Sequence, residues 1–308
     1  MAVIDTGING NHPDLAGNVL PGMSLLPDHP ANGWEDIDAH GTAMAGLIAA
    51  HGHGDGAGIL GIAPKAKIYP IETMSGSNPG TPDTDAAAID AAVQRGARVI
   101  SISIGGAETS NMADAVARAE RADVVIVAGV GNLPQYNTVT WPARYDGVVA
   151  VAAVDRNGNH ADFSVSGRQV LISAPGVDIT STNTGNGYGT GYGTSDSTAI
   201  VAGVVALIRA KFPNIPATEV IHRLTATATD KGPKGRDDQY GYGIVNPYAA
   251  LTADVPPLAA SPSQSPPAQS QTPPAHTNRT GLIIATAAAA LAVIVVAIVL
   301  LTRRRATA

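Results

Sequence analysis

The sequence predicts an α/β fold with a mostly parallel sheet between two layers of helices. Short runs rich in valine and isoleucine alternate with segments of helical spacing through the first 250 residues. The apolar runs are nearly continuous rather than alternating with polar residues, as expected for strands that are covered on both faces. A chain of 308 residues has room for one or two such domains.

The expected elements follow one another along the chain. Strands are predicted at residues 2–4, 68–71, 98–104, 124–128 and 148–154. Helical spacing is found at residues 41–50, 83–95 and 111–121, and residues 195–211 form a long apolar run suited to a buried helix. In folds of this type, ligand chemistry lies at the carboxyl ends of the strands.

The composition changes at the end of this region, so we expect a folded domain over residues 1–252. A linker rich in Pro, Ser and Gln follows at 253–280. Residues 281–302 carry no charge and are long enough to cross about 30 Å of hydrocarbon, which predicts one transmembrane helix. The basic tail 303–308 is then cytoplasmic, and the folded domain lies outside the cell membrane.

The first residues are not typical of a signal peptide, which export of the domain would require. We therefore expect that the natural start of the protein lies upstream of Met1 and that the sequence is truncated there.

Charge and cysteine content exclude several functions. Residues 1–254 hold all 25 acidic residues and 15 of the 19 basic ones, a net charge of −10. An acidic domain without a basic stripe argues against nucleic acid as a partner. The chain has no cysteine, which excludes disulfides, thiolate nucleophiles and cysteine-based metal sites.

Three polar residues lie where the predicted sheet would place a site: Asp5 at a strand end, His40 at a helix start and Ser195 before the apolar helix. Each alone is explained by a turn, a surface or capping histidine, or an N-cap. An aspartic protease would need a second Asp-Thr-Gly or Asp-Ser-Gly, and the sequence has none.

Together the three residues suit nucleophilic catalysis. A serine hydroxyl is a weak nucleophile until an imidazole takes its proton, and a carboxylate fixes the tautomer of that imidazole. Asn132, directly after the predicted strand 124–128, can donate a hydrogen bond to the oxyanion that forms.

The motifs around these residues resemble those of the subtilisin-like serine peptidases, the subtilase family. The resemblance rests on Val3-Ile4-Asp5-Thr6-Gly7, His40-Gly41-Thr42, Gly193-Thr194-Ser195 and Ser103-Ile104-Gly105-Gly106, and it covers about residues 2–252. It implies a three-layer subtilisin-like fold and a serine endopeptidase that cleaves polypeptides. It also implies a further strand, helix and loop before Asp5, without which we expect apolar surface and a sheet edge to be exposed. With the predicted membrane helix, the chain is most similar to the mycosins, membrane-anchored subtilases associated with type VII secretion.

The resemblance implies a role for each matching residue. Ser195 would attack the peptide carbonyl, with His40 as base, Asp5 as its orienting carboxylate, and the Asn132 amide in the oxyanion hole. Substrate would pair as an added strand with Ser103, Ile104, Gly105 and Gly106. One wall of the first specificity pocket would be formed by Gly129, Val130 and Gly131, and Val130 would add apolar contact there.

No cofactor is expected, although some relatives bind structural Ca²⁺. Asp36 and Asp38 lack the spacing of a calcium loop, so we interpret them as acids of a surface loop. Segments 51–55 and 184–193, rich in glycine, are interpreted as a solvated loop and a flexible loop, and the second, with Tyr188 and Tyr192, as a candidate substrate rim.

One departure from the family pattern leaves a second function open. Asp196 places a carboxylate beside Ser195, where it would repel a developing oxyanion. We predict that Asp196→Ala raises turnover. The alternative function is a catalytically weak or inactive subtilase-like module with a structural role in a membrane secretion complex.

Overall fold

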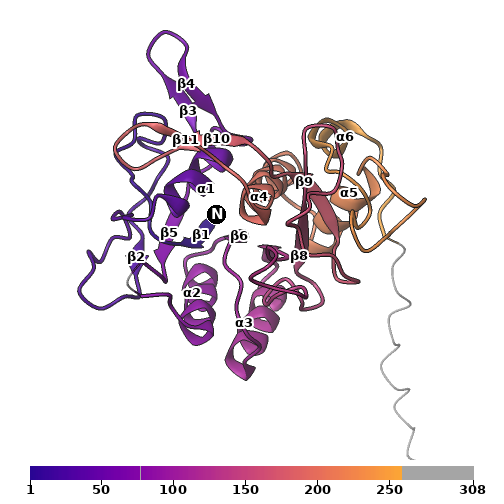
Figure 1. The fold of residues 1–308 in the computed structure, drawn as a ribbon, viewed down its shortest axis with the longest axis horizontal. Helices are drawn as coiled ribbons and strands as arrows, with labels where there is room; N and C mark the ends of the chain where they lie inside the picture. The colour runs from indigo at the N-terminus through magenta and orange to yellow at the C-terminus, as the bar shows by residue number, and fades with distance from the viewer. Residues whose placement is uncertain (77, 259–308) are drawn as a thin grey trace, which may run out of the picture. The chain divides into compact units, whose positions relative to one another are not determined.

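The computed structural model describes residues 1–76 and 78–258, which are built around one seven-stranded sheet (Figure 1). Its strand order is β2-β5-β1-β6-β7-β8-β9, and every neighbouring pair is parallel. The strands are β1 (Ala2–Asp5), β2 (Met23–Ser24), β5 (Tyr69–Glu72), β6 (Val99–Ile102), β7 (Val125–Gly129), β8 (Val149–Val154) and β9 (Ile172–Pro175).

The five predicted strands are all present, with ends that differ by one or two residues. Every residue of β1, β5, β6, β7 and β8 is buried, which explains their continuous apolar sequences. The strand β6 ends at Ile102, two residues earlier than predicted, because the backbone from Ser103 onward leaves the sheet. The edge strand β2 has only two residues, too few to predict from sequence.

Helices cover both faces of the sheet, so the three-layer α/β architecture is confirmed (Figure 1). One face packs against α2 (Pro82–Gln94) and α3 (Ser110–Arg121). The other face packs against the remaining helices: α1 (His40–Ala49), α4 (Thr194–Lys211), α5 (Ala217–Ala226) and α6 (Pro247–Thr252).

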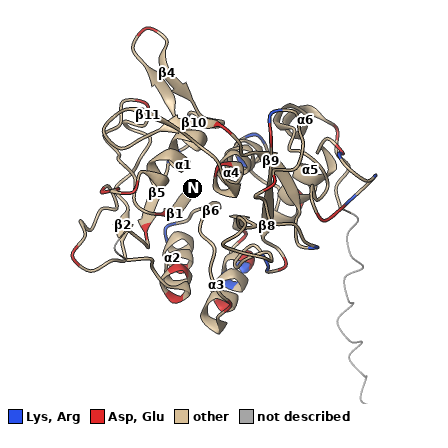
Figure 2. Cartoon of the chain, viewed as in Figure 1, with Lys and Arg blue, Asp and Glu red and all other residues tan. Residues whose placement is uncertain are grey.

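Local sequence explains where the two outer helices begin. The hydroxyl of Thr81 accepts a hydrogen bond from the backbone N–H of Thr84 at the start of α2. Thr109 caps α3 in the same way. The ribbon in Figure 2 is coloured for acidic residues on α2 and for both acidic and basic residues on α3. An ion pair of 2.8 Å between Asp90 of α2 and Arg118 of α3 links the two helices.

The core consists of two apolar layers, one on each face of the sheet. Alternate residues of a strand enter opposite layers, as Val3 and Ile4 of β1 do. The layer beneath α1 and α4 is built mostly from valine, isoleucine and alanine. Small side chains allow α4 to lie close to the sheet, and this holds Ser195 at the helix start near the ends of the strands.

The two glycine-rich segments interpreted as loops are instead antiparallel hairpins. These are β3 (His51–His53) with β4 (Ala57–Leu60), and β10 (Ile179–Thr182) with β11 (Tyr188–Gly191). The fully buried carboxylate of Asp14 connects them. It accepts hydrogen bonds from the backbone N–H of Ile59 at 2.9 Å, the Tyr188 hydroxyl at 3.0 Å and the His53 ring. Three donors to one buried acid hold both hairpins in place.

The expectation of an exposed sheet edge beside the first strand is wrong. The strand β1 lies inside the sheet, with β5 on one side and β6 on the other. The edges of the sheet are β2 and β9. Ala2, Val3 and Ile4 are therefore paired on both sides, whereas Asp5 pairs with Glu72 of β5 alone.

The beginning of the predicted linker lies against α5. Arg223 donates a hydrogen bond to the carbonyl of Ala253 at 2.9 Å, and Glu219 accepts one from the backbone N–H of Leu258 at 2.8 Å. Within residues 1–76 and 78–258, no helix has the length and apolar character needed to cross a membrane. The rest of the linker, the predicted helix 281–302 and the tail 303–308 lie outside the described residues.

Candidate active site

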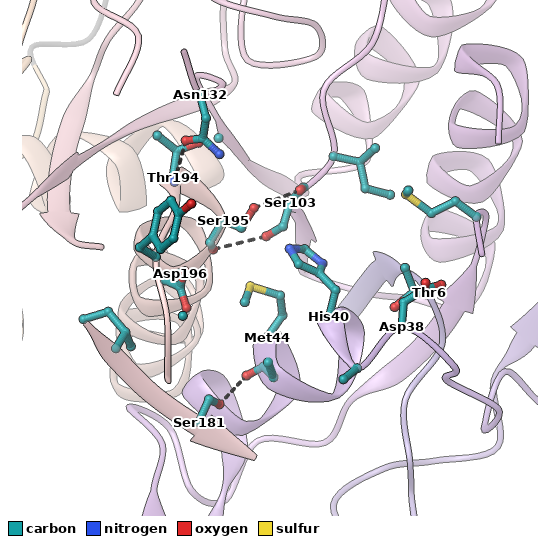
Figure 3. Close-up of a pocket in the computed structure, with 18 of the residues that line it drawn as sticks. Thr6, Asp38, His40, Met44, Ser103, Asn132, Ser181, Thr194, Ser195 and Asp196 are labelled. Carbon is teal, nitrogen blue, oxygen red and sulfur yellow. Dashed lines mark hydrogen bonds between the residues drawn. The ribbon is translucent and has the colours of Figure 1, made fainter. Parts of the chain in front are cut away.

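A cavity of about 870 Å³ lies at the carboxyl ends of the central strands. From β1 the chain continues to β2 and β5 on one side and later crosses to β6 on the other, so the sheet order reverses there. Parallel sheets bind ligands at such reversal points. Residues from the ends of β6 and β7 and from the starts of α1 and α4 line the cavity (Figure 3). Asp5 is the last residue of β1.

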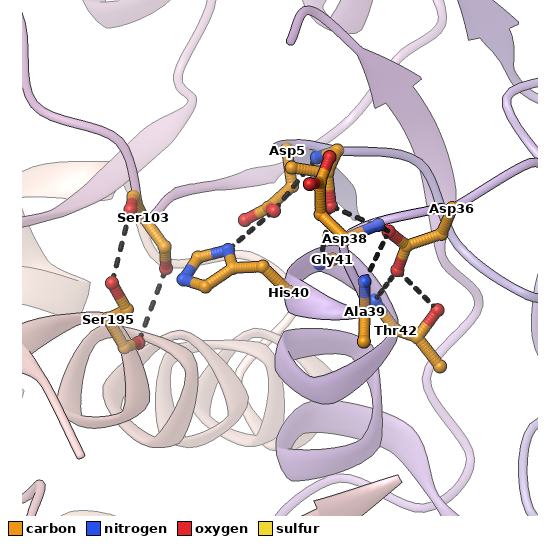
Figure 4. Close-up of polar contacts among 10 residues, drawn as sticks. Asp5, Asp36, Asp38, Ala39, His40, Gly41, Thr42, Ser103 and Ser195 are labelled. Carbon is orange, nitrogen blue, oxygen red and sulfur yellow. Dashed lines mark hydrogen bonds and ion pairs between the residues drawn. The ribbon is translucent and has the colours of Figure 1, made fainter. Parts of the chain in front are cut away.

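His40 and Asp5 form the central polar pair of the site. The Nδ1 atom of His40 lies 2.6 Å from Oδ1 of Asp5, which also accepts a hydrogen bond of 2.8 Å from the backbone N–H of Thr6 (Figure 4). Asp5 is 1% exposed, whereas the His40 side chain is 37% exposed. The carboxylate therefore orients the imidazole from behind and leaves Nε2 directed toward the cavity.

Gly41 permits this close approach. A Cβ atom at position 41 would lie 2.0 Å from the backbone carbonyl oxygen of Gly7. Any side chain there would push α1 away from the turn after β1, and His40 would lose its contact with Asp5. The Gly in His40-Gly41-Thr42 is thus a steric requirement of the pair.

The surrounding acids favour the protonated form of His40. Burial by itself would lower the pKa of the imidazole, but the Asp5 charge and hydrogen bond raise it, with smaller contributions from Asp196 and Asp36. The net result is a pKa raised from 6.5 to about 9. The site is therefore arranged to stabilise an imidazolium ion.

Asp36 is not a surface acid, contrary to the sequence interpretation. It is 8% exposed and accepts hydrogen bonds from the hydroxyl of Thr6 at 2.9 Å and from the hydroxyl and backbone N–H of Thr42 at 2.6 and 2.8 Å. These bonds tie the turn after β1 to the first turn of α1. Between them Ala39 adopts a left-handed conformation with φ of +66°. Asp38 is exposed, as expected.

Ser195 lies in the first turn of α4 and faces the same cavity as His40 (Figure 4). Its hydroxyl donates a hydrogen bond of 3.2 Å to the carbonyl of Ser103, and the Ser103 hydroxyl donates one of 3.3 Å to the carbonyl of Ser195. The Ser195 hydroxyl must therefore rotate from the Ser103 carbonyl to reach the imidazole.

Asn132 is oriented by the backbone at the start of α4. Its Oδ1 accepts a hydrogen bond of 3.0 Å from the N–H of Thr194, which leaves Nδ2 as the donor on the cavity side (Figure 3). The amide and the N–H groups of the first turn of α4 form a group of donors near Ser195. Such a group can stabilise a negatively charged oxygen.

The predicted substrate segments lie partly on the cavity. Ser103, Ile104, Gly105, Gly129 and Gly131 line it. Gly106 instead pairs with Trp141, to whose carbonyl its N–H donates at 3.0 Å.

Val130 also departs from its prediction. Its side chain is 0% exposed and belongs to the core layer beneath α2 and α3, so it cannot contact a bound ligand as expected. The reversal of side chains along an extended backbone explains this, since neighbouring residues point to opposite sides.

Three further residues line the cavity, of which only Tyr192, in the segment interpreted as a substrate rim, was expected from sequence. The Tyr136 hydroxyl donates a hydrogen bond of 2.8 Å to the carbonyl of Gly105. Met44 follows His40 by one helical turn on α1. Tyr192 contributes a 73% exposed ring that packs on Phe163 at 5.4 Å between centroids. Of the two that were not expected, Met44 could have been found from sequence, because residues i and i+4 share a helix face.

Metal-ligating side chains are not gathered anywhere in the part of the chain that the structure describes. No three His, Asp or Glu residues there lie close enough together to hold an ion.

Comparison with known proteins agrees with this geometry. The sequence pattern of the subtilase family matches residues 1–243. Subtilisin DY of Bacillus licheniformis is 39% identical over 254 residues, covering 81% of this chain and 89% of that protein. Subtilisin Savinase of Lederbergia lenta is 38% identical over 251 residues, covering 81% and 89% of the two chains.

Two solved structures share the fold. MycP1 with its N-terminal propeptide removed has a TM-score of 0.73 and 31% identity, over 83% of this chain and 91% of that one. Fervidolysin from Fervidobacterium pennivorans, described as a keratinolytic enzyme related to subtilisin, has a TM-score of 0.75 and 36% identity, over 83% and 42%. The chain belongs to the subtilase family and is a subtilisin-like, mycosin-like serine peptidase.

Proposed function

We propose that the protein is a serine endopeptidase in which Ser195, His40 and Asp5 form the catalytic triad. The observation that carries this proposal is the Asp5–His40 contact of 2.6 Å at a cavity that Ser195 also lines. The reaction uses only side chains and backbone groups of this chain.

The first half of the proposed reaction forms an acyl-enzyme. A peptide pairs with the backbone at Ser103, and the hydroxyl of Ser195 turns from the Ser103 carbonyl toward His40. Nε2 takes its proton as Oγ bonds to the peptide carbonyl carbon. Asn132 Nδ2 and the Ser195 N–H donate to the resulting oxyanion. The imidazolium then protonates the leaving amine as the C–N bond breaks.

The second half restores the enzyme. Water gives a proton to His40 and its oxygen bonds to the acyl carbon. The tetrahedral intermediate collapses, the bond to Ser195 breaks, and Oγ regains the proton. Asp5 stays ionised throughout and stabilises the imidazolium that forms twice per turnover, in agreement with the raised pKa of His40.

We further propose that the peptidase is anchored in the cell membrane by residues 281–302, with its domain extracytoplasmic and its C-terminus cytoplasmic. The uncharged length of that segment and the arginines after it support this topology. The similarity to MycP1 supports a role beside a type VII secretion system, whose components would be partners. Secreted or envelope polypeptides would then be the substrates.

The second candidate function is a structural module of a secretion complex without efficient catalysis. The carboxylate of Asp196, buried beside Ser195, favours it because a charge there opposes an oxyanion.

A fluorophosphonate probe separates the two functions in the full-length protein. The peptidase predicts covalent labelling that Ser195→Ala abolishes and that Ser166→Ala, a change of an exposed serine, leaves intact. No labelling of correctly folded wild-type protein would support the structural module.

A further inference from the structure

Asp196 is a buried carboxylate that has no side-chain partner in the described part of the protein. It is 6% exposed and lines the cavity. Burial raises the pKa of the carboxyl to about 6, even though the charge on His40 lowers it. A buried acid without a partner is unfavourable, so a ligand that supplied a cation would remove this cost.

Among the cavity residues that the structure describes, only His40 can carry a positive charge, and that charge is already paired with Asp5. The charged lining residues of the cavity are Asp38, Asp196 and His40, and neither lysine nor arginine is among the cavity residues that the structure describes. The imidazole is held by Asp5. The electrostatic field of the cavity therefore selects for positively charged ligands.

The position of Asp196 indicates which part of a peptide would meet it. Figure 3 shows Asp196 on the side of Ser195 away from Asn132, toward Ser181. In the proposed reaction the acyl part of the substrate pairs with the backbone at Ser103, and its carbonyl oxygen points to Asn132. The segment beyond the scissile bond then runs past Asp196.

We propose that Asp196 makes the enzyme prefer lysine or arginine as the first residue after the scissile bond. This inference rests on the proposed peptidase function. An ammonium or guanidinium group would pair with the carboxylate in a largely desolvated site. The same pair would neutralise the charge that otherwise repels the oxyanion. A cationic substrate would therefore be both bound more tightly and hydrolysed faster. A neutral residue in that position would leave Asp196 unpaired next to the reacting carbonyl.

The test compares two internally quenched peptides that differ at one position. One has lysine directly after the scissile bond, and the other has norleucine, which has the same carbon chain without the amine. The measured quantity is the ratio of their kcat/KM values at about pH 8, where Asp196 is ionised. We expect wild-type enzyme to favour lysine by about tenfold, the equivalent of lowering the Asp196 pKa by about one.

Two variants locate the source of the preference. Asp196→Asn should bring the ratio close to one and raise kcat/KM for the norleucine peptide. Asp38→Asn removes one charge from an exposed position on the other side of His40, and should leave the lysine preference in place (Figure 3). In wild-type enzyme, about 1 M NaCl should reduce the ratio, a measurement that needs no variant.

The outcomes separate this inference from the function on which it rests. A wild-type ratio near one in an enzyme that cleaves both peptides overturns the role of Asp196 alone, as does a preference that Asp196→Asn retains. Absence of both cleavage and fluorophosphonate labelling overturns the peptidase itself, and this inference with it.

Discussion

Replacing Asp5 with asparagine should reduce catalysis by an amount that depends on pH. The change removes the charge 2.6 Å from the His40 ring but keeps an oxygen that can accept from the imidazole and from Thr6. Asp5 Oδ2 is buried without a hydrogen-bond partner in the described residues, so an amide nitrogen can take its place. The fold should therefore tolerate the variant.

The expected loss of catalytic rate in Asp5→Asn follows from the pKa of His40, which lies at about 9 instead of 6.5. This interval of about 2.5 sets an upper limit of about 3.4 kcal/mol of imidazolium stabilisation, or about 300-fold in rate, because solvent screens the Asp5 charge at the 37% exposed His40 side chain. Asp5 is the largest contribution that raises this pKa, and burial opposes it. Without Asp5 the pKa should fall to its ordinary value or below.

The full loss of kcat/KM in Asp5→Asn should appear only at alkaline pH. At about pH 10 the imidazole is neutral in both proteins, so kcat/KM of Asp5→Asn should be lower by up to about 300-fold. At pH 7 only about 1% of His40 is neutral in the wild-type enzyme, whereas most of His40 is neutral in the Asp5→Asn variant. The deficit should therefore shrink to a few-fold.

The assay is kcat/KM for one fluorogenic peptide between about pH 6 and 10.5. The matched control is Asp38→Asn, which removes an exposed charge that makes no hydrogen bond to His40 and should barely change the apparent pKa. A deficit of Asp5→Asn that is the same at pH 7 and pH 10 would refute the assignment of the His40 pKa to Asp5.

Three further substitutions test the structure through urea unfolding. Ala39→Gly should stabilise the fold by about 0.5–1 kcal/mol, because the left-handed φ of +66° strains alanine more than glycine loses in entropy. Burial raises the pKa of Asp85 to about 6, so its ionisation above that pH weakens the fold. Asp85→Asn should add up to about 3 kcal/mol at pH 8 and nothing near pH 3. Asp14→Ala should cost about 2–4 kcal/mol at pH 7, since three donors lose their acceptor.

The destabilisation caused by Asp14→Ala should also depend on pH. Burial favours the neutral form of Asp14, but hydrogen bonds from His53, Ile59 and Tyr188 outweigh it and lower its pKa. The contribution of the carboxylate is therefore complete above the ordinary pKa and is lost as the pH falls below it. Equal destabilisation at pH 7 and pH 2 would contradict this, as would destabilisation by Ala39→Gly or a pH-independent gain from Asp85→Asn.

The sequence predicted the parallel strands and the polar residues at their ends because both depend on local patterns. Runs such as 148–154 are apolar throughout, and Asp5, His40 and Ser195 sit next to such runs or helices. Their meeting at one cavity follows from the parallel order of the strands, which brings carboxyl ends together.

What could not be predicted depends on contacts between distant segments. Asp36 is polar and lies in a loop, yet it is buried because Thr6 and Thr42 supply its hydrogen bonds. The hairpins at 51–60 and 179–191 are fixed through Asp14, which local spacing does not reveal. Val130 faces the core because of the direction of one backbone turn.

The central claim is that the hydroxyl of Ser195 is the nucleophile, activated across the cavity by His40 and Asp5. Tandem mass spectrometry of the full-length protein after reaction with a fluorophosphonate tests it most directly. The account predicts one phosphonyl adduct per chain, on Ser195, formed faster as the pH rises toward 9 and nearly absent in His40→Ala. An adduct on a different serine, or equal labelling of His40→Ala, would contradict it.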